Sequence, residues 1–153
     1  MPEYLSNKAS ADEIAAHLSR CNGDFVPPLS GRVEINNYAK KIANQAMRFE
    51  AWSGGMLIGL AAVYCNDPAK RVAYVTSVSV LKECTGKGIA AHLMNQCIEH
   101  AKASGRRQIS LEVASGNTPA IRLYEKSGFV ACETNGTFVT MNLYLESGGE
   151  KHG

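Results

Sequence analysis

Residues 78–90 read VSVLKECTGKGIA, and this stretch decides both the fold and the kind of ligand that the chain can bind. Its first part continues a strand-like alternation that ends at Leu81, and its end opens an apolar pattern of helical spacing. The loop from Thr85 to Ala90 therefore brings together unpaired backbone N–H groups and the positive end of a helix dipole. Its two glycines let an anion approach the backbone closely, and Lys87 adds a mobile positive charge. The stretch predicts a phosphate-binding loop.

Two common phosphate-binding motifs do not fit this loop. The nucleotide-triphosphate motif GxxxxGK[ST] lacks its first glycine here, and Lys87 is followed by Gly88. The dinucleotide motif GxGxxG is present only as GxG. Taken alone, the loop is also compatible with a glycine-rich turn that binds no ligand.

Outward from this loop, the chain divides into alternating helical and strand-like patterns. Helices are expected from Ser10 or Ala11 to Asn22–Gly23, from Glu34 to Met47, from Ile89 to Ala103, and from an N-cap at Thr118 to just before Gly128. Strands are expected over 47–52, 56–64, 71–81, 108–113, 130–133 and 138–145, with a short extra strand near 3–6. This order predicts a mixed α/β domain whose sheet carries helices on both faces.

The strand expected at 71–81 has two faces of different character. Period-two spacing places Val72, Tyr74, Val78 and Val80 on one face and Ala73, Val75 and Ser77 on the other. Its content of β-branched residues favours a central position in the sheet.

Bulk properties indicate one domain over residues 1–145 and a polar, glycine-rich tail at 146–153 that we expect to be disordered. The longest apolar stretch, Gly55 to Cys65, is about half of a membrane-spanning helix, and the first residues lack the basic start of a signal peptide. A cytoplasmic location without a membrane partner is therefore expected. Five cysteines without a CxxC pair predict no metal site, and a net charge of +2 without aromatic-basic clusters predicts no nucleic-acid partner.

A second motif follows in residues 117–129, which read NTPAIRLYEKSGF. It matches the pattern NxxAxxLYxxxGF at Asn117, Ala120, Leu123, Tyr124, Gly128 and Phe129. With the loop that precedes it, the chain resembles the GNAT superfamily of acetyl-CoA-dependent N-acetyltransferases over about residues 47 to 145. Thr85 stands where the family loop [QR]xxGx[GA] has Gln or Arg. The resemblance implies a mixed, mostly antiparallel central sheet of about six or seven strands with helices on both faces.

The resemblance also implies acetyl-CoA as the cosubstrate, without a metal. It places the pyrophosphate of coenzyme A on Thr85, Gly86, Lys87, Gly88, Ile89 and Ala90. It places the pantetheine arm and the thioester carbonyl on backbone groups of Val78, Ser79 and Val80, in a strand that carries a bulge in the family. Asn117 is implied as a further cofactor contact.

Two catalytic residues follow from the same resemblance. Tyr124 corresponds to the general acid that protonates the departing thiolate, and Glu112 corresponds to the acidic residue that accepts a proton from the amine, directly or through water. The alternatives are a packed aromatic residue and a charged residue on an exposed strand face. The helical histidines His17, His92 and His100 are given no catalytic role, and direct transfer needs no nucleophilic Cys84.

The expected reaction transfers acetyl from acetyl-CoA to a primary amine by direct attack, with a small molecule as the first candidate acceptor. A peptide N-terminus is the second candidate, and a non-catalytic acyl-CoA-binding module is a third reading that Thr85 leaves open. Candidate wall residues of the acceptor site are Phe25, Pro27, Pro28, Leu29, Arg32 and Tyr38. Arg32 or Arg71 could meet an acidic acceptor or remain solvated. A homodimer through the terminal strands is compatible with such folds.

Overall fold

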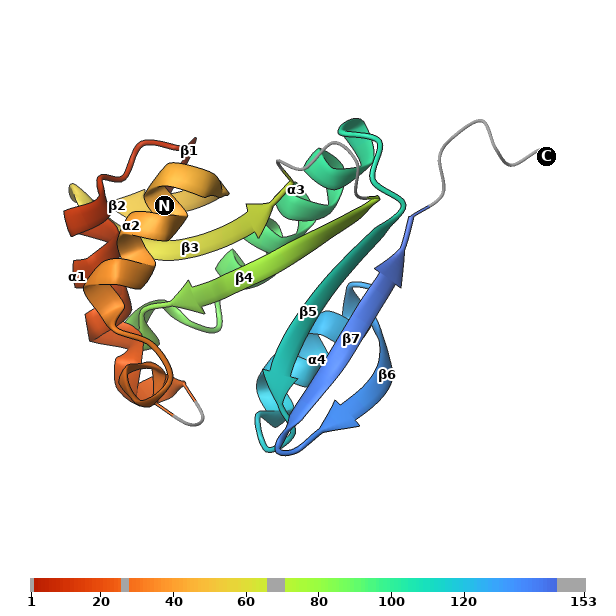
Figure 1. Ribbon diagram of the computed structural model, residues 1–153. Helices are drawn as coiled ribbons and strands as arrows, with labels where there is room; N and C mark the ends of the chain where they lie inside the picture. Colours follow the sequence, from red (N-terminus) through yellow and green to blue (C-terminus); the bar gives the residue numbers. More distant parts are fainter. Residues whose placement is uncertain (1, 26–27, 66–70, 146–153) are drawn as a thin grey trace.

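A computed structural model describes residues 2–25, 28–65 and 71–145, and it shows one seven-stranded sheet with helices on both faces (Figure 1). Across the sheet the strands follow the order β1-β2-β3-β4-β5-β7-β6. The strands are β1 (Glu3–Ser6), β2 (Met47–Ser53), β3 (Met56–Tyr64), β4 (Val72–Val80), β5 (Gln108–Ala114), β6 (Val130–Asn135) and β7 (Phe138–Tyr144). The helices are α1 (Ala11–Cys21), α2 (Ile35–Gln45), α3 (Ile89–Ala103) and α4 (Thr118–Lys126), with 3-10 turns η1 (Asn22–Asp24), η2 (Leu29–Gly31) and η3 (Lys82–Cys84). The expected mixed, mostly antiparallel fold is confirmed, and the tail predicted at 146–153 lies outside the described residues.

The helix ends follow from local sequence, with two differences from expectation. Ser10 caps α1 in a reciprocal capping box with Glu13. The N-cap of α4 is Asn117 and not Thr118, because the Asn117 side-chain oxygen accepts a hydrogen bond from the amide of Ala120 at 3.3 Å. The second helix ends at Gln45 and not at Met47, because Met47 already pairs with Val63 in the sheet.

The sheet opens between β4 and β5, which are neighbours in the sheet and run parallel. Their pairing covers only Val72 to Tyr74 against Gln108 to Ser110. Beyond this point the two strands diverge, as Figure 1 shows, while β5 stays paired with β7 along its whole length. The sheet is therefore two antiparallel halves that are joined at one end of a parallel pair.

A β-bulge in β4 changes which side chains face which layer. The pairing of β3 with β4 shifts between Val63↔Val75 and Ala62↔Ser77, so Thr76 is an extra residue. The period-two prediction therefore fails beyond Val75. Ala73, Val75, Val78 and Val80 pack into the same core, whereas Ser79 reaches His17 of α1 on the opposite face.

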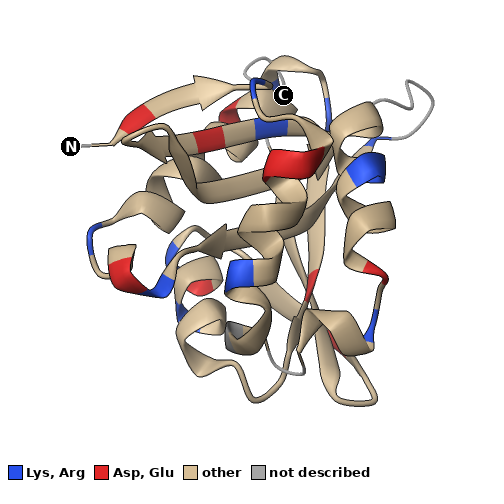
Figure 2. Ribbon diagram, turned by 90° about the vertical axis from the view of Figure 1, so that its left-hand side faces the viewer, with Lys and Arg blue, Asp and Glu red and all other residues tan. Residues whose placement is uncertain are grey.

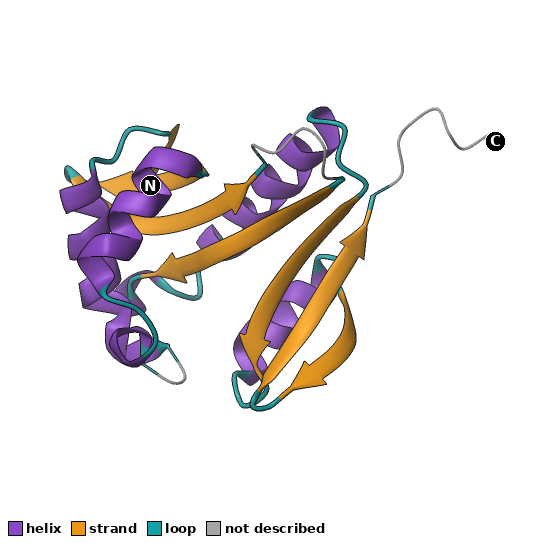
Figure 3. Ribbon diagram, in the orientation of Figure 1, coloured by secondary structure: helices purple, strands orange, loops and turns teal. Residues whose placement is uncertain are grey.

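Two helix layers cover the sheet unequally. On one face α3 packs against β2, β3 and β4, and its core continues to Tyr124 and Phe129 in the α4 segment. On the other face α1 and α2 pack together, and α1 contacts β3 and β4. No helix of the described chain covers β5, β7 and β6 on that second face (Figure 3), and every residue of β6 is exposed. The second face is thus open beside the divergence of β4 and β5.

Basic and acidic residues are interspersed along the described elements in the view of Figure 2. No described helix combines the length and the apolar character that a bilayer crossing requires. Within the described ranges, no three His, Cys, Asp or Glu side chains lie together in a way that could hold a metal ion.

Candidate active site

Two cavities meet where β4 and β5 diverge. The first, here called the loop cavity, has a volume of about 400 Å³ and extends along the loop before α3. The second, here called the splay cavity, has a volume of about 110 Å³ and lies between β4, β5 and the chain before α2. Both cavities are lined by Val78, Asn117, Ala120 and Tyr124. The two cavities therefore lie next to each other and share one wall where the strands diverge.

The loop cavity is lined by nine of the ten residues that the family resemblance assigned to the cofactor. These are Val78, Ser79, Val80, Thr85, Gly86, Gly88, Ile89, Ala90 and Asn117. The tenth residue, Lys87, is exposed and does not line this cavity. A charge at Lys87 is therefore at the surface of the loop, and the lining of the cavity is mainly apolar side chains and backbone.

The loop before α3 requires its glycines for conformation and not for space. Gly86 and Gly88 both have φ of +81°, and no atom lies within 4 Å of a Cβ built on either residue. Gly88 is the N-cap of α3, so the first backbone N–H groups of the helix point toward this end of the cavity without intrahelical partners. This arrangement suits an anion such as a pyrophosphate.

Thr85, the departure from the family pattern, has its hydroxyl engaged within the loop. The Thr85 hydroxyl donates to the carbonyl of Lys82 at 2.8 Å. The side chain thereby closes the 3-10 turn η3 that leads into the glycines. Thr85 contributes to the loop by shaping its backbone.

Tyr124 occupies the junction of the two cavities. It is 8% exposed and packs against Phe129, with ring centroids 6.0 Å apart. Burial, followed by the neighbouring Cys97 thiol, raises the pKa of Tyr124 to about 12. The phenol is therefore protonated throughout the physiological range, and it can donate a hydrogen bond to a group placed between the strands.

Glu112 faces the splay cavity because of its place in β5. Leu111 and Val113 on either side of it pack into the core beneath α3 and α4, so alternation turns Glu112 to the opposite face. Tyr74 of β4 lies near it: burial raises the pKa of Tyr74, the Glu112 carboxylate raises it further, and Arg32 lowers it. The Glu112 carboxylate and the Arg32 guanidinium thus both influence Tyr74 in the cavity wall.

The bulge in β4 is held from α2. The Tyr38 hydroxyl donates to the Thr76 carbonyl at 2.6 Å and lies 2.7 Å from the Thr76 hydroxyl. An extra residue leaves backbone groups outside the strand ladder, and Tyr38 provides a partner for one of them. The next hydroxyl, Ser77 Oγ, is buried in the cavity wall and has no hydrogen-bond partner among the described residues.

The candidate acceptor residues divide into three groups. Phe25 and Arg32 line the splay cavity, and Tyr38 acts on it through Thr76. Leu29 is buried in the core that α1 and α2 form with β3. Pro28 and Arg71 are exposed and line neither cavity. Pro27 lies outside the described residues. The sequence did not single out Phe138, which comes from β7 and enters the site only through the fold.

His17 is the residue whose role the sequence missed most clearly. It is 2% exposed, its Nδ1 lies 3.1 Å from the Leu57 carbonyl, and its Nε2 lies 2.9 Å from the Ser79 hydroxyl. Ser79 belongs to the loop cavity, so His17 supports the cofactor strand from the opposite face. Its position between Ile14 and Cys21, on the apolar stripe of α1, was the available signal.

Comparison with known proteins gives one family match and several relatives. Residues 11–129 match the family model described as Acetyltransferase (GNAT) family. A mycothiol acetyltransferase of Corynebacterium glutamicum is 33% identical over 84 residues, which are 55% of this chain and 28% of that protein. The chain therefore spans well under half the length of that relative.

Solved structures share the fold at low sequence identity. The PaiA N-acetyltransferase of Thermoplasma acidophilum, solved in complex with coenzyme A, has a TM-score of 0.71 and 16% identity, with 94% of this chain and 99% of that chain covered. The ribosomal-protein-S18-alanine N-acetyltransferase of Escherichia coli has a TM-score of 0.76 and 20% identity, with 98% and 97% covered. These likenesses concern the architecture alone.

Proposed function

Because the chain belongs to the acetyltransferase (GNAT) family, we propose that it transfers the acetyl group of acetyl-CoA to the primary amine of a small molecule. The observation that carries the proposal is the position of Tyr124, a buried phenol on the wall that two cavities share. The loop cavity begins at the glycine loop. The splay cavity, between β4 and β5, provides space for a second ligand. Two reactants can therefore meet at Tyr124 without a covalent enzyme intermediate.

The loop cavity fits coenzyme A in its chemistry. Backbone N–H groups around Gly86 and Gly88 suit the pyrophosphate, and the apolar wall at Val78, Val80 and Leu123 suits the pantetheine arm. The family relation and the coenzyme A complex of the PaiA structure support the same ligand. When bound, acetyl-CoA supplies an acetyl thioester whose carbonyl carbon is open to attack by an amine.

The residues of this chain divide the proton transfers between them. Glu112 accepts the proton that the attacking amine loses as the new C–N bond forms, directly or through a water molecule. Backbone N–H groups of β4 near Val78 stabilise the negative charge that develops on the carbonyl oxygen, a contribution of about 3 kcal/mol per well-placed donor. Tyr124 donates its proton to the sulfur as the C–S bond breaks, so the products are an N-acetylated amine and the free thiol.

A peptide N-terminus is the second candidate acceptor. Glu112 resembles the acidic residue of ribosomal-protein N-terminal acetyltransferases, and the Escherichia coli alanine N-acetyltransferase shares the fold. The mycothiol acetyltransferase, by its name, acts outside the class of protein substrates. The small volume of the splay cavity favours the small-molecule acceptor.

The test mixes purified protein with acetyl-CoA and a panel of small amines and N-terminal peptides while free thiol is followed. Tyr124→Phe is expected to lower kcat by about 100-fold or more, the size of a lost general acid, while coenzyme A still binds. Tyr144→Phe is the matched control, because Tyr144 is 62% exposed and lines neither cavity. Binding without thiol release for any amine would favour the acyl-CoA-binding module, and an absence of coenzyme A binding would refute the proposal.

A further inference from the structure

Arg32 projects over the wall of the splay cavity without a carboxylate partner. It follows η2, it is exposed, and its guanidinium carbon lies 4.6 Å from the centroid of the Phe138 ring. In the described part of the chain, the ion pairs are Arg48 with Glu50 and Lys102 with Glu99, so Arg32 takes part in none. Its positive charge is therefore available to a ligand.

The contact with Phe138 sets the direction of this charge. Phe138 lies on β7, opposite Ala114 of β5, whereas Arg32 comes from the segment that leads into α2. The arginine thus reaches across the opening between the two halves of the sheet. The cation–π contact with the Phe138 ring favours this position of the guanidinium and leaves its N–H groups able to bind an anion.

The remaining polar groups of the cavity suit an amine. Its lining includes the carboxylate residue Glu112 and the polar residues Tyr74, Thr76, Ser77 and Asn117. Glu112, Tyr74 and Arg32 all line this cavity, and both charges act on the pKa of Tyr74, so the carboxylate and the guanidinium both lie near its side chain. The buried Tyr124 also lines this cavity.

We propose that the acceptor is an amino-acid-like molecule, whose carboxylate binds the Arg32 guanidinium while its amine lies between Glu112 and Tyr124. This inference rests on the proposed acetyl transfer and narrows its acceptor. A carboxylate can accept two parallel hydrogen bonds from the fork of an arginine, a geometry that lysine cannot reproduce. An acceptor without the anionic group binds the same cavity through its amine alone.

The experiment compares acceptors that differ only in the carboxylate. Glycine, β-alanine and phenylalanine are each paired with the corresponding primary amide, and kcat/KM is measured by thiol release at saturating acetyl-CoA. The quantity of interest is the acid-to-amide ratio of kcat/KM in each variant divided by that ratio in the wild type. This double ratio cancels the different basicities of the amines.

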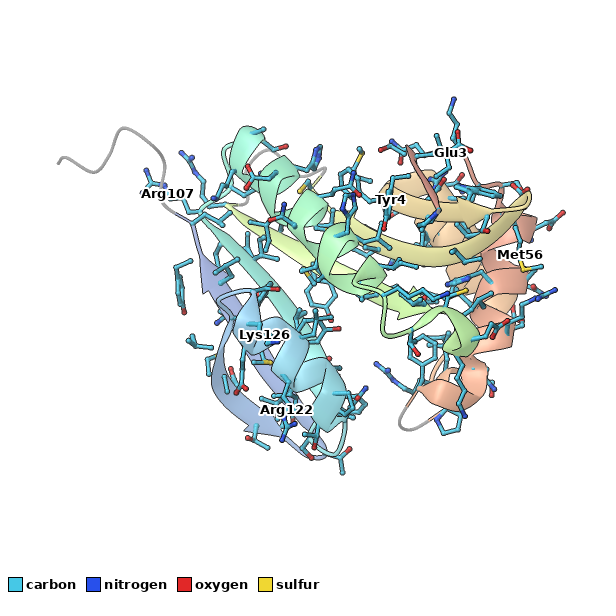
Figure 4. All side chains as sticks on the ribbon, turned by 180° about the vertical axis from the view of Figure 1, so that it is seen from behind. Glu3, Tyr4, Met56, Arg107, Arg122 and Lys126 are labelled. Carbon is cyan, nitrogen blue, oxygen red and sulfur yellow. The ribbon has the colours of Figure 1, made fainter. Side chains whose placement is uncertain are left out.

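Arg32→Gln is expected to lower the acid-to-amide ratio by about tenfold or more, the effect of a lost charge-assisted hydrogen bond. Arg32→Lys, which keeps the charge without the fork, should restore part of the loss. Arg122→Gln is the matched control, because Arg122 is an exposed arginine on α4 (Figure 4) and lines neither cavity. The KM for acetyl-CoA should not change in any of the three variants.

The outcomes separate this inference from the proposed function. Turnover with an unchanged acid-to-amide ratio in Arg32→Gln would overturn the carboxylate contact and leave acetyl transfer intact. Efficient turnover of dipeptides that is insensitive to Arg32→Gln would identify a peptide N-terminus as the acceptor and also overturn it. Coenzyme A binding without thiol release for any acceptor would remove both proposals.

Discussion

At the scale of single residues, the hydrogen bonds of His17 determine the tautomer of its neutral ring. A carbonyl only accepts, so Nδ1 carries the hydrogen that is donated to Leu57, and the lone pair of Nε2 accepts the hydrogen of the Ser79 hydroxyl. Burial lowers the pKa of His17, an effect that these contacts oppose only in part. The neutral ring is therefore the form that holds Ser79 in the cofactor strand.

This arrangement predicts a pH-dependent contribution to stability. Because the folded-state pKa of His17 is depressed, its contribution is fully present above the unfolded value of about 6.5 and is lost as the pH falls through the folded value. His17→Phe should lower the free energy of unfolding by about 2 kcal/mol near pH 7.5, since it leaves two buried groups without a partner. The difference in the free energy of unfolding between the wild type and His17→Phe, measured by urea unfolding, should become smaller toward pH 5.

Ser79→Ala provides the matched comparison for His17. It removes the same hydrogen bond from the other side and keeps the histidine, so the double variant should be less destabilised than the sum of the two single variants. A gap between wild type and His17→Phe that is independent of pH would contradict the neutral-ring account.

At the scale of elements, the bulge in β4 shows where sequence reasoning succeeds and where it fails. The alternation in 71–81 correctly predicted a strand, and the pattern of 89–103 gave the bounds of α3 as observed. The bulge adds one residue at Thr76 without changing the apolar pattern, so Ser77, Val78 and Val80 were assigned to the wrong faces. Strand content depends on local residue types, whereas register depends on the partner strand β3.

The hydrogen bond from Tyr38 of α2 to the bulge in β4 leads to a prediction for Tyr38. Burial raises the pKa of Tyr38 to about 12, so its hydroxyl remains a donor to the Thr76 carbonyl at all physiological pH values. Tyr38→Phe should cost about 1 kcal/mol in the free energy of unfolding and should weaken coenzyme A binding, because the cofactor residue Val78 lies two positions after Thr76 in the same strand. Calorimetric titration with coenzyme A and urea unfolding measure the two effects.

Thr76→Val is the control for Tyr38, because it removes the Thr76 hydroxyl and keeps the carbonyl that Tyr38 binds. The bulge account requires Thr76→Val to affect coenzyme A affinity less than Tyr38→Phe. Equal affinities in Tyr38→Phe and the wild type would show that β4 keeps its bulge without help from α2.

At the scale of the whole molecule, only the cofactor side of the site could be predicted from the sequence. The cofactor residues are local: most belong to one strand, loop and helix in succession, and nine of ten line one cavity. The acceptor side combines Arg32, Thr76, Glu112 and Phe138 from four separate parts of the chain. Nothing in the sequence near any one of them specifies the others, because their proximity follows from the sheet order and from the divergence of β4 and β5.

Because β4 and β5 diverge, we expect bound coenzyme A to contact both halves of the sheet and so to stabilise the folded molecule. The two halves of the sheet share only the pairs from Val72 to Tyr74, and the loop cavity is lined from both sides, by β4 and α3 and by α4. A ligand at about 100 times its dissociation constant adds about 2.7 kcal/mol, which for a domain of this size raises Tm by roughly 5–10 °C. Pantetheine, which lacks the phosphates, should give a smaller rise at the same concentration. Gly88→Ala should reduce the rise in Tm that coenzyme A causes, because the alanine is strained at φ of +81°.

Hydrogen exchange should slow in β4 and also in α4 when coenzyme A binds. Protection confined to Thr85–Ala90, with α4 unchanged, would show that the ligand rests on one half of the sheet and does not join the two.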